Sequence, residues 1–324
     1  MADGMIGRRP LLASAAALGL AKEAAADTWP SRPIKLVAPF APGGGSDFTS
    51  RLIAEKLGAR LGQTMIVDNK PGAGGNLGAE AALKAPADGY TYLAISGSYA
   101  INSILHKPSF DSLNDIVAIG QFTDEPTVLT VNPAVPARTL AELVALCRRQ
   151  PGKLSYGSSG PGGLAHLGTE FFLDAAGIDV THVPYRGTAP ALADLLAGNL
   201  QMLTGGSTTM LPYLKNGQVR GLATSSTKRL AAAPNIPSYG EQGYPTLDFS
   251  LWHGMIAAKG VPAEVVKRMN SELDAVLKSP EVSSRLAEDG VLAVGGTPDA
   301  FMATIRAEIA RWQAFIERTK IKLE

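Results

Sequence analysis

Four glycine-rich loops carry the residues of this chain that could do chemistry. They read APGGGSD at 41–47, PGAGGN at 71–76, YGSSGPGG at 156–163 and PYRGTAP at 184–190. Glycine lets backbone N–H groups approach a ligand closely, and each loop leads into an expected helix whose N-terminus favours negative charge. The four loops together predict a cleft that binds a small organic anion.

Polar side chains lie at or near the expected helix starts. Ser46, Asn76, Ser158 and Thr188 can each either cap a helix or reach a ligand, and capping is the preferred role for any one alone. A carboxylate beside an anion site would repel the ligand. Asp47 is therefore expected to cap a helix or accept from an amide, although it would suit a ligand that carries an amino group.

Two histidines and a Tyr-Arg pair are further candidates. His166 and His182 have no partner at metal-ligand spacing, so each is expected to bond a ligand or to be a structural histidine. Tyr185 could close over a ligand. Arg186 could pair with a carboxylate or remain a solvated surface charge.

The glycine loops do not fit the enzyme motifs that they superficially resemble. GAGGNLG at 72–78 misses the dinucleotide spacing, and Lys153 after Gly152 is not followed by serine or threonine. GSSGP at 157–161 has proline where a hydrolase elbow needs glycine. The sequence predicts no catalytic residue, no metal site and no cofactor.

Composition and charge limit the partner classes. The chain has 324 residues, of which 45% are hydrophobic and 18% charged, and a formal net charge of +1. No basic cluster with interleaved aromatics occurs, so nucleic acid is not expected as a partner. A single cysteine, Cys147, excludes an intramolecular disulfide. These features favour a soluble protein of about two domains.

The N-terminal segment predicts export. Arg8 and Arg9 precede the apolar run 11–21, and the alanines at 24–26 suit cleavage before Asp27. The run is too short to span a bilayer. Residues 1–26 are interpreted as a signal peptide of either the twin-arginine or the Sec route, and the mature protein is expected in the periplasm.

Alternation of short β-branched runs with amphipathic helical stretches predicts an α/β fold. Strands are expected at 34–40, 65–69, 91–96 and 127–133, and the last helices at 263–278 and 298–319. Two chain crossings would form a hinge, where Trp252 and His253 line the cleft or fill the core. The expected division is a first lobe of 27–128, a second lobe of 129–250 and a return of 251–324 to the first.

The whole mature chain resembles the Bug or TctC family of periplasmic receptors for tripartite tricarboxylate transporters. The resemblance rests on four segments in the family's order: WPSRPIKLVAPFAPGGGSD, VDNKPGAGGNLGAEAALKAPADGYTYL, LSYGSSGPGGLAHL and HVPYRGTAPALADLLAG. It implies a two-lobe Venus-flytrap fold with the ligand between the lobes.

The resemblance also implies which residues contact the ligand. In the family, backbone groups and ordered water at the first two loops hold a carboxylate, and the second lobe contributes its serine loop and VPY segment. Gly163 and Gln201 depart from the common pattern, so the stretch around Gly205, Gly206 and Ser207 could form a pocket wall specific to this chain. The expected set is Phe40, Ala41, Gly43, Gly44, Ser46, Asp47, Gly72, Ala73, Gly74, Gly75, Asn76, Ser158, Gly160, His166, Tyr185, Gly205 and Ser207.

The function implied is capture of a mono- or dicarboxylate, aliphatic or aromatic, and its delivery to membrane transporter subunits by a monomeric receptor. Two alternatives stay open: a ligand sensor without a transport role, and an exported carboxylic-ester hydrolase that uses a serine of the YGSSG loop.

Overall fold

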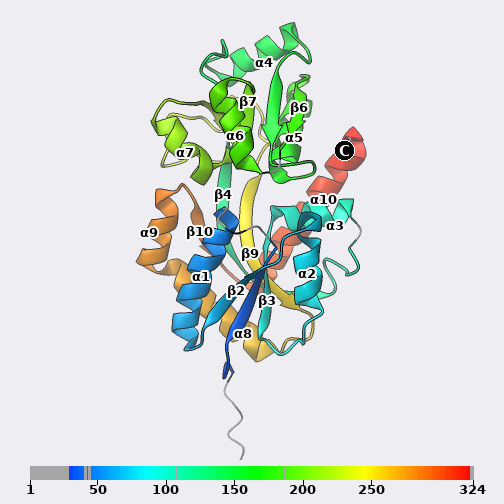
Figure 1. The fold of residues 1–324 in the computed structure, drawn as a ribbon, viewed down its shortest axis with the longest axis vertical. Coiled ribbons are helices and arrows are strands. Elements are labelled where there is room, and N and C mark those ends of the chain that lie inside the picture. Colours follow the sequence, from blue (N-terminus) through cyan, green and yellow to red (C-terminus); the bar gives the residue numbers. More distant parts are fainter. Residues whose placement is uncertain (1–28, 40–41, 43–44, 107, 186, 322–324) are drawn as a thin grey trace, which may run out of the picture.

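The computed structural model describes residues 29–39, 42, 45–106, 108–185 and 187–321 (Figure 1). The expected signal peptide lies outside the described residues. So do Phe40, Ala41, Gly43 and Gly44 of the first glycine loop, and Arg186.

Ten strands form one mixed sheet in the order β2-β1-β3-β9-β4-β7-β5-β6, and β8 and β10 also pair with β4. The strands are β1 Ile34–Ala38, β2 Met65–Asn69, β3 Thr91–Ser96, β4 Ile116–Val131, β5 Ser155–Ser158, β6 Thr181–Pro184, β7 Met202–Gly206, β8 Arg220–Thr224, β9 Ser250–Ala258 and β10 Leu292–Gly295.

The long strand β4 joins two halves of the molecule. Its residues 116–126 pair with β9, and part of that stretch also pairs with β10, whereas 127–131 pair with β7 and β8. We call the part built on β1, β2, β3, β9 and β10 the first half, and the part built on β5–β8 the second half. The chain returns to the first half where β9 begins (Figure 1).

The parallel strands of the two halves run in opposite directions, so that their C-terminal ends face each other. β1, β2 and β3 run parallel, and β3 and β4 are both antiparallel to β9, so all four point toward the second half. In the second half, β7 and β8 are antiparallel to β4, and β5 and β6 run parallel to β7. The loops that follow β1, β2, β3, β5, β6 and β7 therefore all lie at the junction of the halves.

Helices cover both halves (Figure 1). In the second half, the start of α4 is capped by Thr139, whose hydroxyl accepts from the Glu142 N–H, and the Glu142 carboxylate accepts from the Arg138 N–H just before the cap. The helices are α1 Gly45–Leu61, α2 Asn76–Leu83, α3 Gly97–Leu105, α4 Leu140–Arg149, α5 Leu164–Ala176, α6 Thr188–Ala197, α7 Ser207–Lys215, α8 Ala263–Lys278, α9 Pro280–Glu288 and α10 Pro298–Thr319.

The last helix, α10, spans both halves. Phe301 near its start is buried against β9, and its ring meets Trp252 edge-on. Trp312 near its end is buried in the core of the second half, where it packs on Phe171 and Phe249. The long helix thus provides a connection between the halves in addition to β4 and the return into β9.

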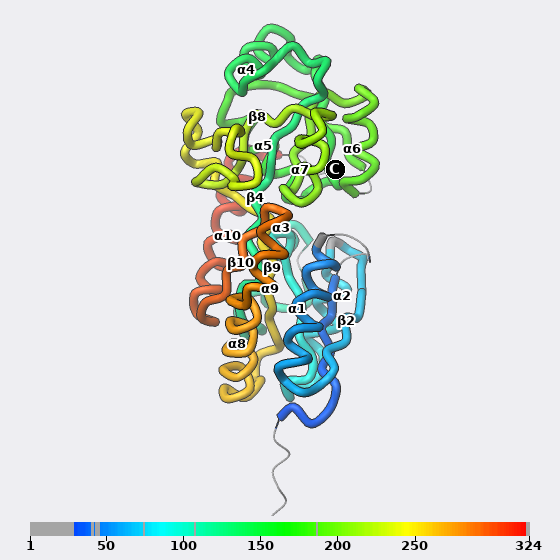
Figure 2. The backbone as a smooth tube through the Cα atoms, turned by 90° about the vertical axis from the view of Figure 1, so that its left-hand side faces the viewer, coloured from blue at the N-terminus to red at the C-terminus, as the bar shows by residue number. Residues whose placement is uncertain are grey.

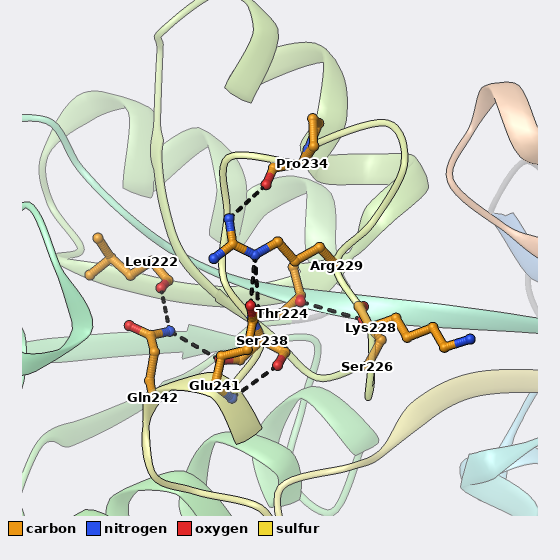
Figure 3. A network of polar contacts seen from close by, with 9 residues as sticks. All are labelled: Leu222, Thr224, Ser226, Lys228, Arg229, Pro234, Ser238, Glu241 and Gln242. Atoms are coloured by element: carbon orange, nitrogen blue, oxygen red, sulfur yellow. Dashed lines mark hydrogen bonds and ion pairs between the residues drawn. The ribbon is translucent and has the colours of Figure 1, made fainter.

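Polar contacts brace the connection from β8 to β9 (Figure 3). Arg229 donates to both carboxylate oxygens of Glu241 at 2.9 and 3.1 Å and to the Pro234 carbonyl at 3.0 Å. Glu241 in turn accepts from the Ser238 N–H, and its own N–H donates to the Ser238 hydroxyl. These bonds hold the loop in one shape beside the junction.

Candidate ligand-binding site

The first glycine loop reaches the two strands that connect the halves. Ser46 is the second residue of α1, and its Oγ lies 2.7 Å from His253 Nε2 on β9. The other ring nitrogen of His253 lies 3.1 Å from Thr123 Oγ1 on β4. Thr123 and His253 are opposite each other in the sheet and both are buried. Burial lowers the pKa of His253 to about 4, so this imidazole is neutral at pH 7.

Asp47 faces its own half. Its carboxylate accepts from Arg51 Nε at 3.0 Å and from the Asn69 side-chain amide at 2.8 Å, and Arg51 also donates to Asn69. The interactions match the amide-acceptor role expected for this carboxylate. They fix the first turn of α1 to the end of β2 and neutralise the buried charge.

The second glycine loop adopts left-handed backbone conformations. Gly72, Ala73 and Gly75 have φ values of 130°, 48° and 104°, and the Gly75 N–H donates to the Gly72 carbonyl at 2.9 Å. Alanine rarely occupies this region, so the surrounding contacts hold Ala73 there at some cost. The φ of 130° at Gly72 is one that residues with a β-carbon rarely adopt, which favours glycine at this position.

A small pocket borders the second glycine loop. Its polar lining comes from Asn76 at the start of α2, from Ser96 and Ser98 at the start of α3, and from Asn102 within α3. Its volume of about 10 Å³ is close to the minimum that holds one water molecule. In this arrangement a larger ligand group would enter only if the lining moved apart.

The serine loop is packed against three stacked rings. The centroid of the His182 ring lies 3.9 Å from that of His166 and 4.9 Å from that of Tyr156. Ser158 Oγ lies 2.7 Å from His182 Nε2, and the Gly162 N–H donates to His166 Nδ1 at 3.0 Å. Burial, with a smaller contribution from His182, lowers the pKa of His166 to about 4, and burial also lowers the pKa of His182. The stack is therefore uncharged at neutral pH.

Ser158 itself is fully buried, and its hydroxyl also lies within hydrogen-bond distance of the Gly160 carbonyl. The Tyr185 N–H donates to the Ser158 carbonyl at 3.1 Å, which joins the serine loop to the VPY segment. The Tyr185 hydroxyl donates to Asp194 on α6 at 2.5 Å. The two predicted segments are thus brought together, with the phenol directed at α6.

The stretch after β7 contacts the first half. The Ser207 hydroxyl donates to the Gly290 carbonyl at 3.1 Å, and the Thr208 N–H donates to Glu125 Oε1 at 3.0 Å. A β-carbon on Gly206 would lie 2.3 Å from the same carboxylate oxygen. Burial raises the pKa of Glu125 to about 7, and the nearby Asp289 adds to this shift. Gly206 and Thr208 thus border a buried carboxyl on the connecting strand.

Thr123 and Glu125 were not identified from the sequence, although both lie at the junction. The signal for them is the run QFTDEPTVLTV, in which polar residues interrupt a strand that is otherwise apolar. Polar side chains inside a buried strand need hydrogen-bond partners, and here His253 and Thr208 supply them. Among the described residues, no helix is both long and apolar enough to cross a bilayer, and no group of three or more potential metal ligands occurs.

The sequence matches the profile of the family described as "Tripartite tricarboxylate transporter family receptor" over residues 49–321. It is 35% identical to the protein BugT of Bordetella pertussis over 312 residues, which cover 95% of this chain and 96% of BugT.

Solved structures of similar sequence have the same fold. The periplasmic binding protein BugD is 30% identical, with a TM-score of 0.80 over 91% of this chain and 99% of BugD. An R. palustris protein with adipate is 33% identical, with a TM-score of 0.82 over 89% and 97% of the two chains. MatC from Rhodopseudomonas palustris with bound malate is 27% identical, with a TM-score of 0.79 over 88% and 99%.

The fold class predicted from the sequence, an α/β periplasmic-binding-protein fold, is confirmed by these structures. The resemblance found in the glycine loops is confirmed by the profile and by BugT, so this chain belongs to the receptor family of the tripartite tricarboxylate transporters.

Proposed function

We propose that this protein captures a small organic carboxylate between its two halves and delivers it to the membrane subunits of a tripartite tricarboxylate-type transporter. The observation that carries the proposal is the opposition of strand ends, because glycine loops from both halves meet at one junction. Ligands of open α/β sheets bind outside the carboxyl ends of the strands. The relatives solved with adipate and malate support a carboxylate.

The junction can bind an anion through partial charges and neutral hydrogen-bond donors, without a buried Lys or Arg side chain. Backbone N–H groups of the glycine loops and the N-termini of α1, α2, α5 and α6 offer partial positive charge. Neutral imidazoles and hydroxyls can add hydrogen bonds without a fixed charge. The residues proposed to contact the ligand remain those expected from the sequence, and Ser158, which is fully buried in this arrangement, would do so only after the serine loop opens.

We propose that the two halves close because the ligand binds the closed arrangement more tightly than the open one. A ligand that touches both halves only when they are closed shifts the population toward that state, which the transporter then recognises. We propose 27–128 and 251–324 as one lobe and 129–250 as the other. The hinge lies in β4 near Pro126 and in the segment that enters β9, and the end of α10 restrains the motion.

Export completes the proposal. Residues 1–26 serve as a signal peptide that directs the mature protein to the periplasm, where BugD, a binding protein of similar structure, is described as residing. The proposed partners are a mono- or dicarboxylate, aliphatic or aromatic, and the transporter subunits. The receptor acts as a monomer.

Thermal unfolding of residues 27–324 with a panel of carboxylates, amino acids and sugars tests the proposal. A ligand at a hundred times its Kd stabilises the folded state by about 2.7 kcal/mol, so a true ligand raises the Tm. The proposal expects shifts with members such as adipate, malate or benzoate. Shifts with uncharged sugars alone would refute the anion site.

The same preparation tests whether the ligand is only bound. Ser158 and His182 have the spacing of a nucleophile and a base, but Ser158 is fully buried. We propose that the protein does not hydrolyse carboxylic esters. Turnover of a chromogenic ester that disappears in Ser158→Ala, and persists in Ser159→Ala, would instead support the hydrolase.

A further inference from the structure

Three polar side chains form a chain of hydrogen bonds from the connecting strands to the first glycine loop. Thr123 of β4, His253 of β9 and Ser46 of α1 follow one another at 3.1 and 2.7 Å. Thr123 has no exposed surface and His253 is 6% exposed, whereas Ser46 is half-buried. The chain therefore runs from the core outward to the proposed ligand loop.

The direction of these hydrogen bonds follows from the protonation of His253. The imidazole lies between two hydroxyl groups, and its burial disfavours the charged form. A neutral imidazole carries one N–H donor and one acceptor nitrogen. One of its two hydroxyl neighbours must therefore donate to the ring, and the other must accept from it.

Thr123 decides between the two tautomers. Its hydroxyl hydrogen needs an acceptor because it is fully buried, and His253 Nδ1 is the acceptor that the described residues offer. If Nδ1 carried the proton instead, the Thr123 hydroxyl hydrogen would be left buried without a partner. Thr123 therefore donates to Nδ1, and the proton of His253 resides on Nε2, which donates to Ser46 Oγ.

The hydroxyl hydrogen of Ser46 is then left to donate elsewhere. Within the described part of the chain, the only side-chain partner of Ser46 Oγ is His253 Nε2. We propose that His253 is a positioning residue that holds the Ser46 hydroxyl as a hydrogen-bond donor to a carboxylate oxygen of the ligand. The inference rests on the proposed function and adds to it the residue that sets the polarity of this contact.

The consequence is selectivity for an acceptor at this point of the ligand. A carboxylate oxygen accepts from the Ser46 hydroxyl hydrogen, whereas an ammonium group could only donate to the remaining lone pair of Ser46 Oγ and would leave that hydrogen without an acceptor. Because Thr123 and His253 are neighbours in the paired strands β4 and β9, the hydroxyl is also held relative to the hinge. Rigid support of this kind reduces the entropy lost when the ligand binds.

The tautomer is measurable in the protein without a ligand. Nitrogen-15 spectra of histidine-labelled protein, residues 27–324, distinguish a protonated Nε2 from a protonated Nδ1. The His253 signal is assigned by its loss in His253→Gln. The inference expects the Nε2–H tautomer at pH 7 and the same neutral form at pH 5.5. An Nδ1–H tautomer or a charged ring would overturn it.

Affinity for the tightest binder among adipate, malate and benzoate tests the link to the ligand. Loss of one hydrogen bond to a charged group weakens binding about ten-fold to a hundred-fold, so Ser46→Ala should do so. His253→Leu should weaken binding about ten-fold. His253→Gln, whose amide can donate from the position of Nε2, should restore most of the affinity.

Thr123→Val has a matched control on the same strand. Thr130→Val removes an equally buried hydroxyl, which donates to the Leu203 carbonyl at 2.8 Å away from this hydrogen-bond chain. Thr123→Val should weaken binding and Thr130→Val should not. Equal effects of the two variants, or equal effects of His253→Leu and His253→Gln, would overturn the positioning role. If no carboxylate binds the wild-type protein, the proposed function fails. The direction of the hydrogen bonds among Thr123, His253 and Ser46 is tested separately, by the tautomer that the nitrogen-15 spectra show.

Discussion

The hydroxyl of Ser207 donates a hydrogen bond to the carbonyl of Gly290 at 3.1 Å, and this bond joins the second half of the protein to the first. Figure 2 shows the start of α7 directly above the turn that follows α9. A β-carbon on Gly290 would lie 3.2 Å from the Ser207 side chain, so the two segments are in close contact. The contact lies beside the buried carboxyl of Glu125.

Ser207→Ala should lower the free energy of unfolding by about 1 kcal/mol, because one intramolecular hydrogen bond is lost. Hydrogen exchange at the first turn of α7 should accelerate. Ser103→Ala is the control, since its hydroxyl bonds to the Ala100 carbonyl within α3. Urea unfolding and exchange measured on both variants check the prediction; faster exchange in α7 of the control variant would contradict it.

Glu125→Gln should change how stability depends on pH. The carboxyl ionises near its ordinary pKa of about 4.3 in the unfolded chain and at about 7 in the folded protein. Between these values the folded state holds a proton that the unfolded state has lost, so this group makes the wild type less stable as pH rises.

The glutamine side chain can still accept from the Thr208 N–H, and it does not titrate. Stability of Glu125→Gln relative to the wild type should therefore increase from pH 4.5 to pH 8, at roughly 1.4 kcal/mol per unit of pKa shift. Urea titrations at several pH values measure the difference. A difference independent of pH would show that Glu125 is ionised in the folded protein.

His166→Asn should change the pH dependence of stability in the opposite direction to Glu125→Gln. The pKa of His166 is lowered to about 4, so between about pH 6.5 and 4 the unfolded chain binds a proton that the folded protein excludes. This group makes the wild type less stable as pH falls through that window. The asparagine side chain of the variant keeps an acceptor for the Gly162 N–H, so the fall in its free energy of unfolding between about pH 6.5 and 4 should be smaller than in the wild type. Urea titrations at several pH values measure this, and an equal fall in both proteins would contradict the prediction.

Trp312→Ala should destabilise the protein by about 3–5 kcal/mol, the usual cost of deleting a buried aromatic side chain. Trp312 is fully buried and its indole N–H donates to Glu308 at 3.0 Å. Because α10 connects the halves, its last turns should also exchange faster. Met302→Ala, at a half-buried position near the start of the same helix, provides the comparison and should cost less.

Secondary structure with a clear apolar period was predicted closely from the sequence. The strands at 65–69 and 91–96 and the helices at 263–278 and 298–319 match β2, β3, α8 and α10. β4 was expected only from 127, whereas it begins at Ile116. Its first part contains Gln121, Thr123 and Glu125, all buried, and polar residues inside a strand hide its period.

The chemistry of the site was predictable only at the level of its loops. Glycine loops after strands indicate where backbone N–H groups gather, and this needs no knowledge of distant residues. The bond from Ser46 to His253 joins residues 207 positions apart, and only strand order brings them together. The orientation of the Asp47 side chain likewise depends on a hydrogen bond from Asn69 in the next strand.

Hydrogen exchange with a saturating carboxylate tests the central claim most directly. The measurement compares the protein, residues 27–324, with and without the tightest binder of the panel. Capture between the halves predicts protection at 72–76 in the first half and at 158–166 and 205–207 in the second half together. Protection confined to one half, or to the pocket of about 380 Å³ lined by Asp124, Lys228 and Leu292, would contradict it.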